Sequence, residues 1–277
     1  MTGAEITTVR IDIPAGRIDV VGVPGRDEVS VVVNPSNRMR AGDREAADNA
    51  SVERSGDAIV VTAPSRTSVF GKPDSVDVIV EGPRGLSVDA QTKYGEIRLV
   101  GELGAARLQA TYGAVRVDTV AALELTGGHG AVRVRHVSGD ATVALSNGSA
   151  KVESAEGALS VRGSNGAIAV ESVAGPATLE TTNGSIKVGS ALAGLDARTT
   201  HGSITLRDLA GGVSRCETSM GAVRVGVRPG VPLWLDAASD HGAVVMDLEA
   251  DGGPVAGEDP VELHVRTGYG AVKVHRA

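Results

Sequence analysis

Cysteine, aromatic residues and long apolar runs are scarce in this chain of 277 residues. The single cysteine, Cys216, excludes an internal disulfide, which fits a reducing compartment. Phe, Trp and Tyr together make up 2% of the residues, so a core must be built from Val, Leu, Ile and Ala. No stretch approaches the roughly 20 consecutive apolar residues that span a bilayer, so we expect no transmembrane segment.

An excess of basic charge and an export signal are also lacking. The formal net charge of −7 argues against a generally basic nucleic-acid binder, and we expect no specific nucleic-acid partner. The opening MTGAEITTVRIDIPAG alternates apolar and polar residues and lacks the basic segment and apolar run of a secretory signal. We therefore expect a cytoplasmic protein.

Glycine is abundant, with 37 residues, and a short motif built around it recurs ten times. YGAVRV, at residues 112–117, is a clear copy, and a weaker one surrounds Gly16. The steps between copies are 17 or 18 residues as far as Gly202 and then lengthen to 19, 21 and 28. Such a period is typical of a repeat architecture. The ten glycines are Gly95, Gly113, Gly130, Gly148, Gly166, Gly184, Gly202, Gly221, Gly242 and Gly270.

Apolar and polar residues alternate on both sides of each glycine. Around Gly166, for example, Leu159 and Val161 precede it and Ile168 and Val170 follow it. This is the period of a strand with one buried face. The glycine between two strands predicts a corner with positive φ.

Two further positions of the repeat, each filled by similar residues in several copies, refine this picture. Asn147, Asn165 and Asn183 precede the glycine, and asparagine is tolerated in the same left-handed region. An apolar residue seven positions after the glycine, such as Val173, predicts a short third side to each repeat.

A unit of about 18 residues cannot bury its apolar face alone, so the copies must stack. We predict an all-β fold, a β-solenoid of about ten such repeats over residues 84–277. A third inward column of small residues favours stacking: Ala110, Gly127, Gly163, Thr181 and Thr199. An antiparallel meander or prism, with each Asn-Gly as a hairpin turn, stays open.

Residues 1–83 are less regular, and we interpret them as an N-terminal β cap region continuous with the solenoid. A charged segment around residues 42–50 suits a helix. Insertions at Gly226–Pro232 and Glu249–Pro260 are expected to lengthen the last repeats. Strand patterns occur at Thr7–Ile13, Gly16–Val21, Val29–Val33, Ile59–Thr62 and Val76–Val80.

The Tyr/Asn/His-Gly-Ser/Ala-Ile/Val-x-Val units from Tyr94 to Val274 follow an irregular β region. In this they resemble a bacterial β-strand-repeat family labelled "putative adhesin", a domain of unknown function. The resemblance covers most of the chain, and its motif is structural and has no catalytic residues to transfer. Relatives of this kind include proteins linked to cell-envelope stress responses, so the resemblance implies such a link.

Basic residues dominate the outward position three residues after the glycine, where they occupy seven of ten copies. On stacked repeats they would form a positive stripe that suits an anionic polymer, an anionic surface or an acidic protein. The competing interpretation is that they keep the face soluble and discourage sheet aggregation. The seven are Arg98, Arg116, Arg133, Lys151, Lys187, Arg224 and Lys273.

Other candidate residues are weaker. His129, His201 and His241 share the column before the glycine, but other residue types separate them, so we expect turn stabilisation and no metal or cofactor. Cys216 falls in an inward column, which predicts inert core. Trp234 alternates outward, which suits either a partner or packing at the edge of a repeat.

No catalytic motif occurs in its expected context. We predict a non-enzymatic structural or interaction protein that presents a β-solenoid surface, with self-association through the solenoid ends as a further expectation. Three alternatives stay open. They are an exported surface adhesin, a carbohydrate-active β-helix enzyme with paired carboxylates beside aromatic residues, and a cytoskeleton-like polymer with apolar ends.

Overall fold

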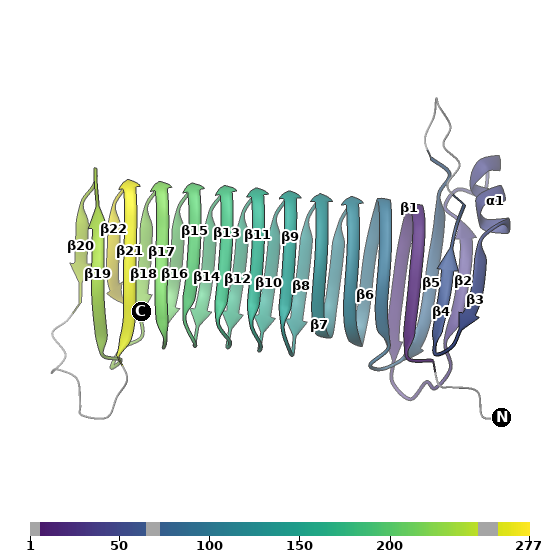
Figure 1. The fold of residues 1–277 in the computed structure, drawn as a ribbon, viewed down its shortest axis with the longest axis horizontal. Helices are drawn as coiled ribbons and strands as arrows, with labels where there is room; N and C mark the ends of the chain where they lie inside the picture. Colours follow the sequence, from purple (N-terminus) through teal and green to yellow (C-terminus); the bar gives the residue numbers. More distant parts are fainter. Residues whose placement is uncertain (1–5, 65–72, 249–259) are drawn as a thin grey trace. The chain divides into compact units, whose positions relative to one another are not determined.

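The computed structural model describes residues 6–64, 73–248 and 260–277, and it is nearly all β, with 70% strand and 3% helix (Figure 1). The chain divides into two compact units, Met1–Ser138 and Gly139–Ala277. In each unit, strands of successive copies pair in parallel and in register, as β1 does with β6 and β11 with β13. The predicted β-solenoid is therefore confirmed, and the antiparallel meander is excluded.

The first unit begins with the less regular part of the chain and continues into the repeats. Its elements are β1 (Thr8–Val23), β2 (Ser30–Pro35), α1 (Ala41–Asp48), β3 (Ser51–Ser55), β4 (Ala58–Thr62), β5 (Val76–Pro83), β6 (Ser87–Tyr112), β7 (Val115–His129) and β8 (Val132–Val137).

The N-terminal region forms one complete rung and a cap. β1 pairs with β6 so that Gly16 lies opposite Gly95, and the weak copy of the motif is therefore a true rung. On its other side β1 pairs with β4 and β5, which are flanked by the antiparallel strands β3 and β2. Helix α1 packs against β2. The sequence did not predict β3, because its residues are mostly polar and exposed.

The second unit holds the regular repeats, each made of two strands. Its strands are β9 (Ala141–Asn147), β10 (Ala150–Ala155), β11 (Leu159–Asn165), β12 (Ile168–Val173), β13 (Ala177–Asn183), β14 (Ile186–Ala191), β15 (Leu195–His201), β16 (Ile204–Leu209), β17 (Val213–Met220), β18 (Val223–Val227), β19 (Leu233–Ser239), β20 (Val244–Asp247), β21 (Val261–Tyr269) and β22 (Val272–Arg276).

The predicted third side does not form a separate strand in these repeats. Val173, which was assigned to it, is the buried last residue of β12, and residues 174–176 turn directly into β13. The alternation of buried and open positions in β12 breaks just before Val173, because neither Glu171 nor Ser172 is buried.

The last two copies stack in the reverse of their chain order. β17 pairs with β21, and β21 in turn pairs with β19; on the other side β18 pairs with β22, and β22 with β20. The insertion at Gly226–Pro232 thus leads the chain past one rung position, which β21 and β22 later fill. This corrects the expectation that the insertions only lengthen rungs; the second insertion, apart from Pro260, lies outside the described residues.

The core consists of aliphatic columns that run from rung to rung. In the first unit Ile97, Val115 and Val132 lie in one column and are at most 3% exposed. In the second unit Ile186 and Ile204 lie in an equivalent column and are fully buried. Val, Leu and Ile suffice for this core because each side chain packs against its counterparts on the neighbouring rungs as well as across the narrow interior.

The motif glycines are required by the contact between neighbouring rungs. A β-carbon at Gly113 would lie 1.5 Å from the carbonyl oxygen of Gly95, and one at Gly166 would lie 2.0 Å from that of Gly148. The expected positive φ is present at both positions, 150° and 138°, but Gly95 and Gly184 lie outside that region. The shared reason for glycine is therefore the close approach of backbones, and positive φ is a secondary one.

Buried threonines hold the carbonyl groups of these corners. Thr199 donates a hydrogen bond to the carbonyl oxygen of Gly184 at 3.0 Å, and Thr218 donates to that of Gly202 at 3.0 Å. Both side chains are 6% exposed. The predicted small-residue column thus also supplies a hydroxyl that satisfies backbone acceptors at the corner.

We expect Gly166→Val to lower the free energy of unfolding by at least about 3 kcal/mol, because its side chain would overlap the backbone of Gly148. Lys187→Ser, an exposed change on the same sheet, should alter it by no more than about 0.5 kcal/mol. Chemical denaturation of the two variants and the parent measures both effects. Equal midpoints for the two variants would contradict the corner contact.

We expect Thr199→Val to cost about 1–3 kcal/mol, because it preserves the shape of the side chain but removes the hydrogen bond to Gly184. The matched control is Thr200→Val, one residue further along and exposed, for which a change within about 0.5 kcal/mol is expected. Urea unfolding followed by circular dichroism distinguishes them. A Thr199→Val variant as stable as its control would show that the hydroxyl contributes nothing.

Candidate interaction surface

The basic residues predicted for one face form a continuous ladder in the first unit. Arg98 lies opposite Arg116, and Arg116 lies opposite Arg133, on adjacent parallel strands. The strand spacing of about 4.8 Å therefore separates like charges. Because like charges directly opposite each other are destabilising, this arrangement does not serve the stability of the sheet.

In the second unit the same column is interrupted by short residues. Its order in space is Lys151, Ala169, Lys187, Thr205, Arg224, Lys273 and Val245. Arg224 and Lys273 are adjacent like charges, whereas Lys187 is flanked by Ala169 and Thr205. The structure thus places all seven predicted basic residues in outward columns, three in one unit and four in the other.

Acidic residues on the same face neutralise only some of these cations. Arg116 forms an ion pair with Glu96, and Lys151 pairs with Glu153 at 3.3 Å. Within the described ranges, the other five basic residues of the ladder have no ion-pair partner: Arg98, Arg133, Lys187, Arg224 and Lys273. Unneutralised cations therefore remain in this column in both units of an acidic protein, and in the first unit they flank the paired Arg116.

On the opposite face, basic and acidic residues alternate from strand to strand. In the second unit Arg162, Glu180, Arg198 and Glu217 follow one another on adjacent strands. Successive ion pairs join them at 3.1, 3.9 and 3.2 Å. Exposed pairs of this kind contribute little stability, but their alternation cancels the field of the face. The contrast makes the basic ladder the better candidate for binding.

The corner column before the glycines is filled by stacked planar groups. In the first unit Tyr112 is sandwiched between Tyr94 and His129, with ring centroids 5.2 and 5.0 Å away. In the second unit Asn165 donates to Asn147, and Asn183 donates to Asn165, each at 2.9 Å. None of these asparagines has positive φ, so the expected left-handed conformation is wrong and an amide ladder takes its place.

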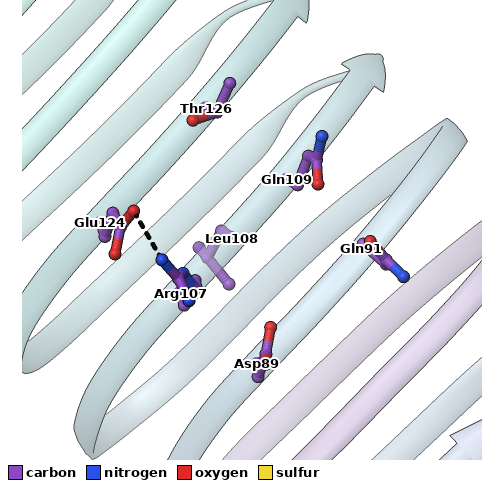
Figure 2. A pocket seen from close by; sticks show the side chains of 7 residues that line it. All are labelled: Asp89, Gln91, Arg107, Leu108, Gln109, Glu124 and Thr126. Carbon is purple, nitrogen blue, oxygen red and sulfur yellow. Dashed lines mark hydrogen bonds and ion pairs between the residues drawn. The ribbon is translucent and has the colours of Figure 1, made fainter.

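A polar hollow of about 340 Å³ lies on the first unit, over β6 and β7 (Figure 2). The carboxylates of Asp89 and Glu124 lie on either side of Arg107, which donates to Glu124 at 3.1 Å. The other lining residues are Gln91, Leu108, Gln109 and Thr126. The carbohydrate-active alternative requires carboxylates beside exposed aromatic faces. No aromatic residue lines this hollow, and both faces of Tyr112 are covered by neighbouring rings.

The three column histidines are not brought together. His129 stacks on Tyr112, His241 stacks on Tyr269 at 4.5 Å, and His201 lies between Asn183 and Met220. Among residues 6–64, 73–248 and 260–277, no group of three or more His, Cys, Asp or Glu residues is arranged to hold a metal ion.

The side chain of Cys216 faces the interior of the solenoid, whereas that of Trp234 faces outward. Cys216 is fully buried in an inward column, as predicted, and burial raises the pKa of its thiol to about 12. Trp234 is 50% exposed on β19, and its ring lies 5.1 Å from that of His264. The outward position of Trp234 is therefore confirmed, while its role stays a prediction.

The terminal rung of the second unit leaves apolar side chains open. Val244 and Met246 occupy the inward columns of Val272 and Val274, yet they are 38% and 55% exposed. In the described part of the chain β19 and β20 each pair on one side only. Self-association through this end stays a prediction.

No helix in the described ranges is long and apolar enough to cross a bilayer.

Two solved structures are similar to the chain over almost its whole length. A "putative cell adhesion protein" from Clostridium sporogenes ATCC 15579 has 12% identity and a TM-score of 0.23, covering 99% of this chain and 94% of that one. A "putative adhesin" from Bacteroides fragilis NCTC 9343 has 9% identity and a TM-score of 0.35, covering 98% and 92%. Among curated proteins no match is found.

A family model matches the repeats together with the rung that precedes them. It spans residues 11–218, from within β1 to within β17, and includes the copies of the glycine motif as far as Gly202. The resemblance to an adhesin-like domain of unknown function, predicted from the repeated glycine motif, is confirmed. The chain belongs to the Toastrack family, DUF4097.

Proposed function

We propose that this protein is a non-enzymatic interaction protein that holds an acidic polymer along its basic ladder. The observation that carries this proposal is the run of Arg98, Arg116 and Arg133 on adjacent strands, in which like charges lie about one strand spacing apart. A linear polyanion that lies across the strands would meet one cation per rung. Its charges would relieve the repulsion within the ladder.

The scaffold supports this role because the ladder residues are attached to a buried core. The residues on either side of Arg116, Val115 and Val117, are at most 3% exposed, so the positions of the cations are fixed by packing. Binding along such a column is chiefly electrostatic. We therefore expect it to weaken as salt screens the charges over the Debye length of about 10 Å at 0.1 M.

We expect the triple variant Arg98→Ser/Arg116→Ser/Arg133→Ser to bind fluorescent polygalacturonate at least about tenfold more weakly than the parent, a loss of about 1.4 kcal/mol. Fluorescence anisotropy at low ionic strength measures the affinity, and a repeat with neutral dextran tests the need for charge. Binding by the parent should fall steeply between 50 and 200 mM salt, about the range in which screening grows.

The matched control removes three arginines from faces whose charges already alternate: Arg107→Ser/Arg162→Ser/Arg198→Ser. Each of these arginines pairs with a glutamate, and the variant lowers the net charge by the same three units. It should bind within about twofold of the parent. Equal losses in the two triple variants would point to net charge alone and overturn the proposed ladder, as would a parent that does not bind the polymer.

A further inference from the structure

A second feature of the basic face lies in the second unit, where long cationic side chains surround short ones. A hollow of about 580 Å³ lies over β12, β14, β16 and β18. Its floor includes Ala169, Gly189 and Thr205, which occupy the outward positions next to the cations. The hollow exists because residues with short side chains occupy these outward positions. We call it the basic hollow.

Arg207 borders the basic hollow and is held in place by an unusual contact. Its guanidinium donates to Glu171 at 2.7 Å, although Glu171 lies two strands away, on β12. The side chain reaches that far across Gly189, where a β-carbon would lie 3.1 Å from Nη2 of Arg207. Gly189 therefore lets the guanidinium cross the intervening strand close to the sheet surface.

Two more cations face the hollow without a partner. Lys187 and Arg224 are exposed, lie on either side of Thr205, and form no ion pair or hydrogen bond within the described ranges. The two strand spacings between them amount to about 9.6 Å. Such a gap is wide enough to admit a ligand group between the two side chains.

Hydroxyl groups complete the set of donors. Ser203 and Thr205 line the hollow and are partly exposed, and their hydroxyls form no hydrogen bond to other described residues. Hydroxyls on the floor and cations on the walls thus converge on the same space. Glu171 is the one carboxylate among the lining residues of the hollow, and Arg207 occupies it.

We infer that the basic hollow binds a phosphate group, centred over Thr205 between Lys187 and Arg224. A phosphate group is tetrahedral, so its oxygens point in different directions, which suits donors arriving from the floor and from both walls. The free ion has four such oxygens, and a phosphodiester has two non-bridging oxygens together with two ester oxygens. Arginine binds phosphate with two parallel hydrogen bonds, and lysine acts as a point charge. A carboxylate, with two oxygens in one plane, would use fewer of these donors.

The inference goes beyond the acidic polymer proposed above and is tested separately from it, although Lys187 and Arg224 are also members of the basic ladder. The hollow uses Lys187, Arg207 and Arg224 of the second unit, whereas the polymer test changes Arg98, Arg116 and Arg133 of the first. The phosphate could be a free ion or a phosphodiester of a larger chain. The same site chemistry serves both, and the experiment separates them.

Isothermal titration calorimetry of the full chain with inorganic phosphate, and separately with poly(glycerol phosphate), tests the site. We expect the parent to bind at least one of them, and Lys187→Ser/Arg224→Ser to bind it at least about tenfold more weakly. Thr205→Val, which keeps every charge, should weaken it about threefold or more by removing one donor. Binding of the polymer alone assigns a phosphodiester ligand to the hollow only where Lys187→Ser/Arg224→Ser weakens it, because the ladder of the first unit also attracts a polyanion. Binding of the ion alone or of both assigns free phosphate as sufficient.

The control is Arg162→Ser/Arg198→Ser, which removes two cations from the opposite face and should leave phosphate affinity within about twofold of the parent. All substitutions are at exposed or partly exposed positions, and a thermal unfolding curve for each variant verifies the fold. The inference is overturned if the parent binds neither probe. It is also overturned if the Lys187/Arg224 variant, or the Thr205 variant, binds as tightly as the parent.

Discussion

The approach of one corner glycine to the carbonyl group of the next is the contact on which the rungs depend. At Gly113 and Gly166 a single added carbon would lie within about 2 Å of a neighbouring carbonyl oxygen. The corner amides then donate to the residue before the next glycine, as Gly166 does to Asn183 at 2.8 Å. Because the corners stack this closely, the strands on both sides are in register, and a side chain of an inner rung has its counterparts directly above and below, apart from local register shifts such as the one after Leu99. Aliphatic columns, amide ladders and charged columns are all consequences of that register.

The register gives the two faces different electrostatic properties. Where the repeats alternate arginine and glutamate, as at Arg162 and Glu180, neighbouring rungs neutralise one another. Where successive repeats place arginine at the same position, as at Arg116 and Arg133, the charges accumulate instead. Exposed ion pairs add little to stability, so the alternating face is best understood as a surface that attracts few charged partners. On the face where arginines occupy the same position in successive repeats, each further rung adds positive charge. This face is therefore the one that attracts anionic partners.

The two units also end differently. In the first unit the outermost parallel strands carry antiparallel β2 and β3, and the inward residues of β5, such as Val78, are fully buried. In the second unit the terminal rung is β19 and β20, and its inward Met246 is 55% exposed. β21 and β22, whose Val265 and Val274 are fully buried, occupy the inner position. The copy that comes last in the chain thus lies inside, and the copy before it lies at the edge with apolar side chains left exposed.

The sequence by itself determined the repeat, the alternation of apolar and polar residues in both strands of each repeat, and the aliphatic core. It also determined the outward column that contains Arg98 and Lys187. These depend on alternation and on a fixed spacing, which are local properties of the chain. It did not determine the conformation of Asn165, the number of separate strands per rung or the chain's return past one rung position. Those depend on contacts between residues that are distant in sequence. The basic hollow was decided only by the tertiary structure, because Glu171, Gly189 and Arg207 become neighbours only when three repeats are stacked in register.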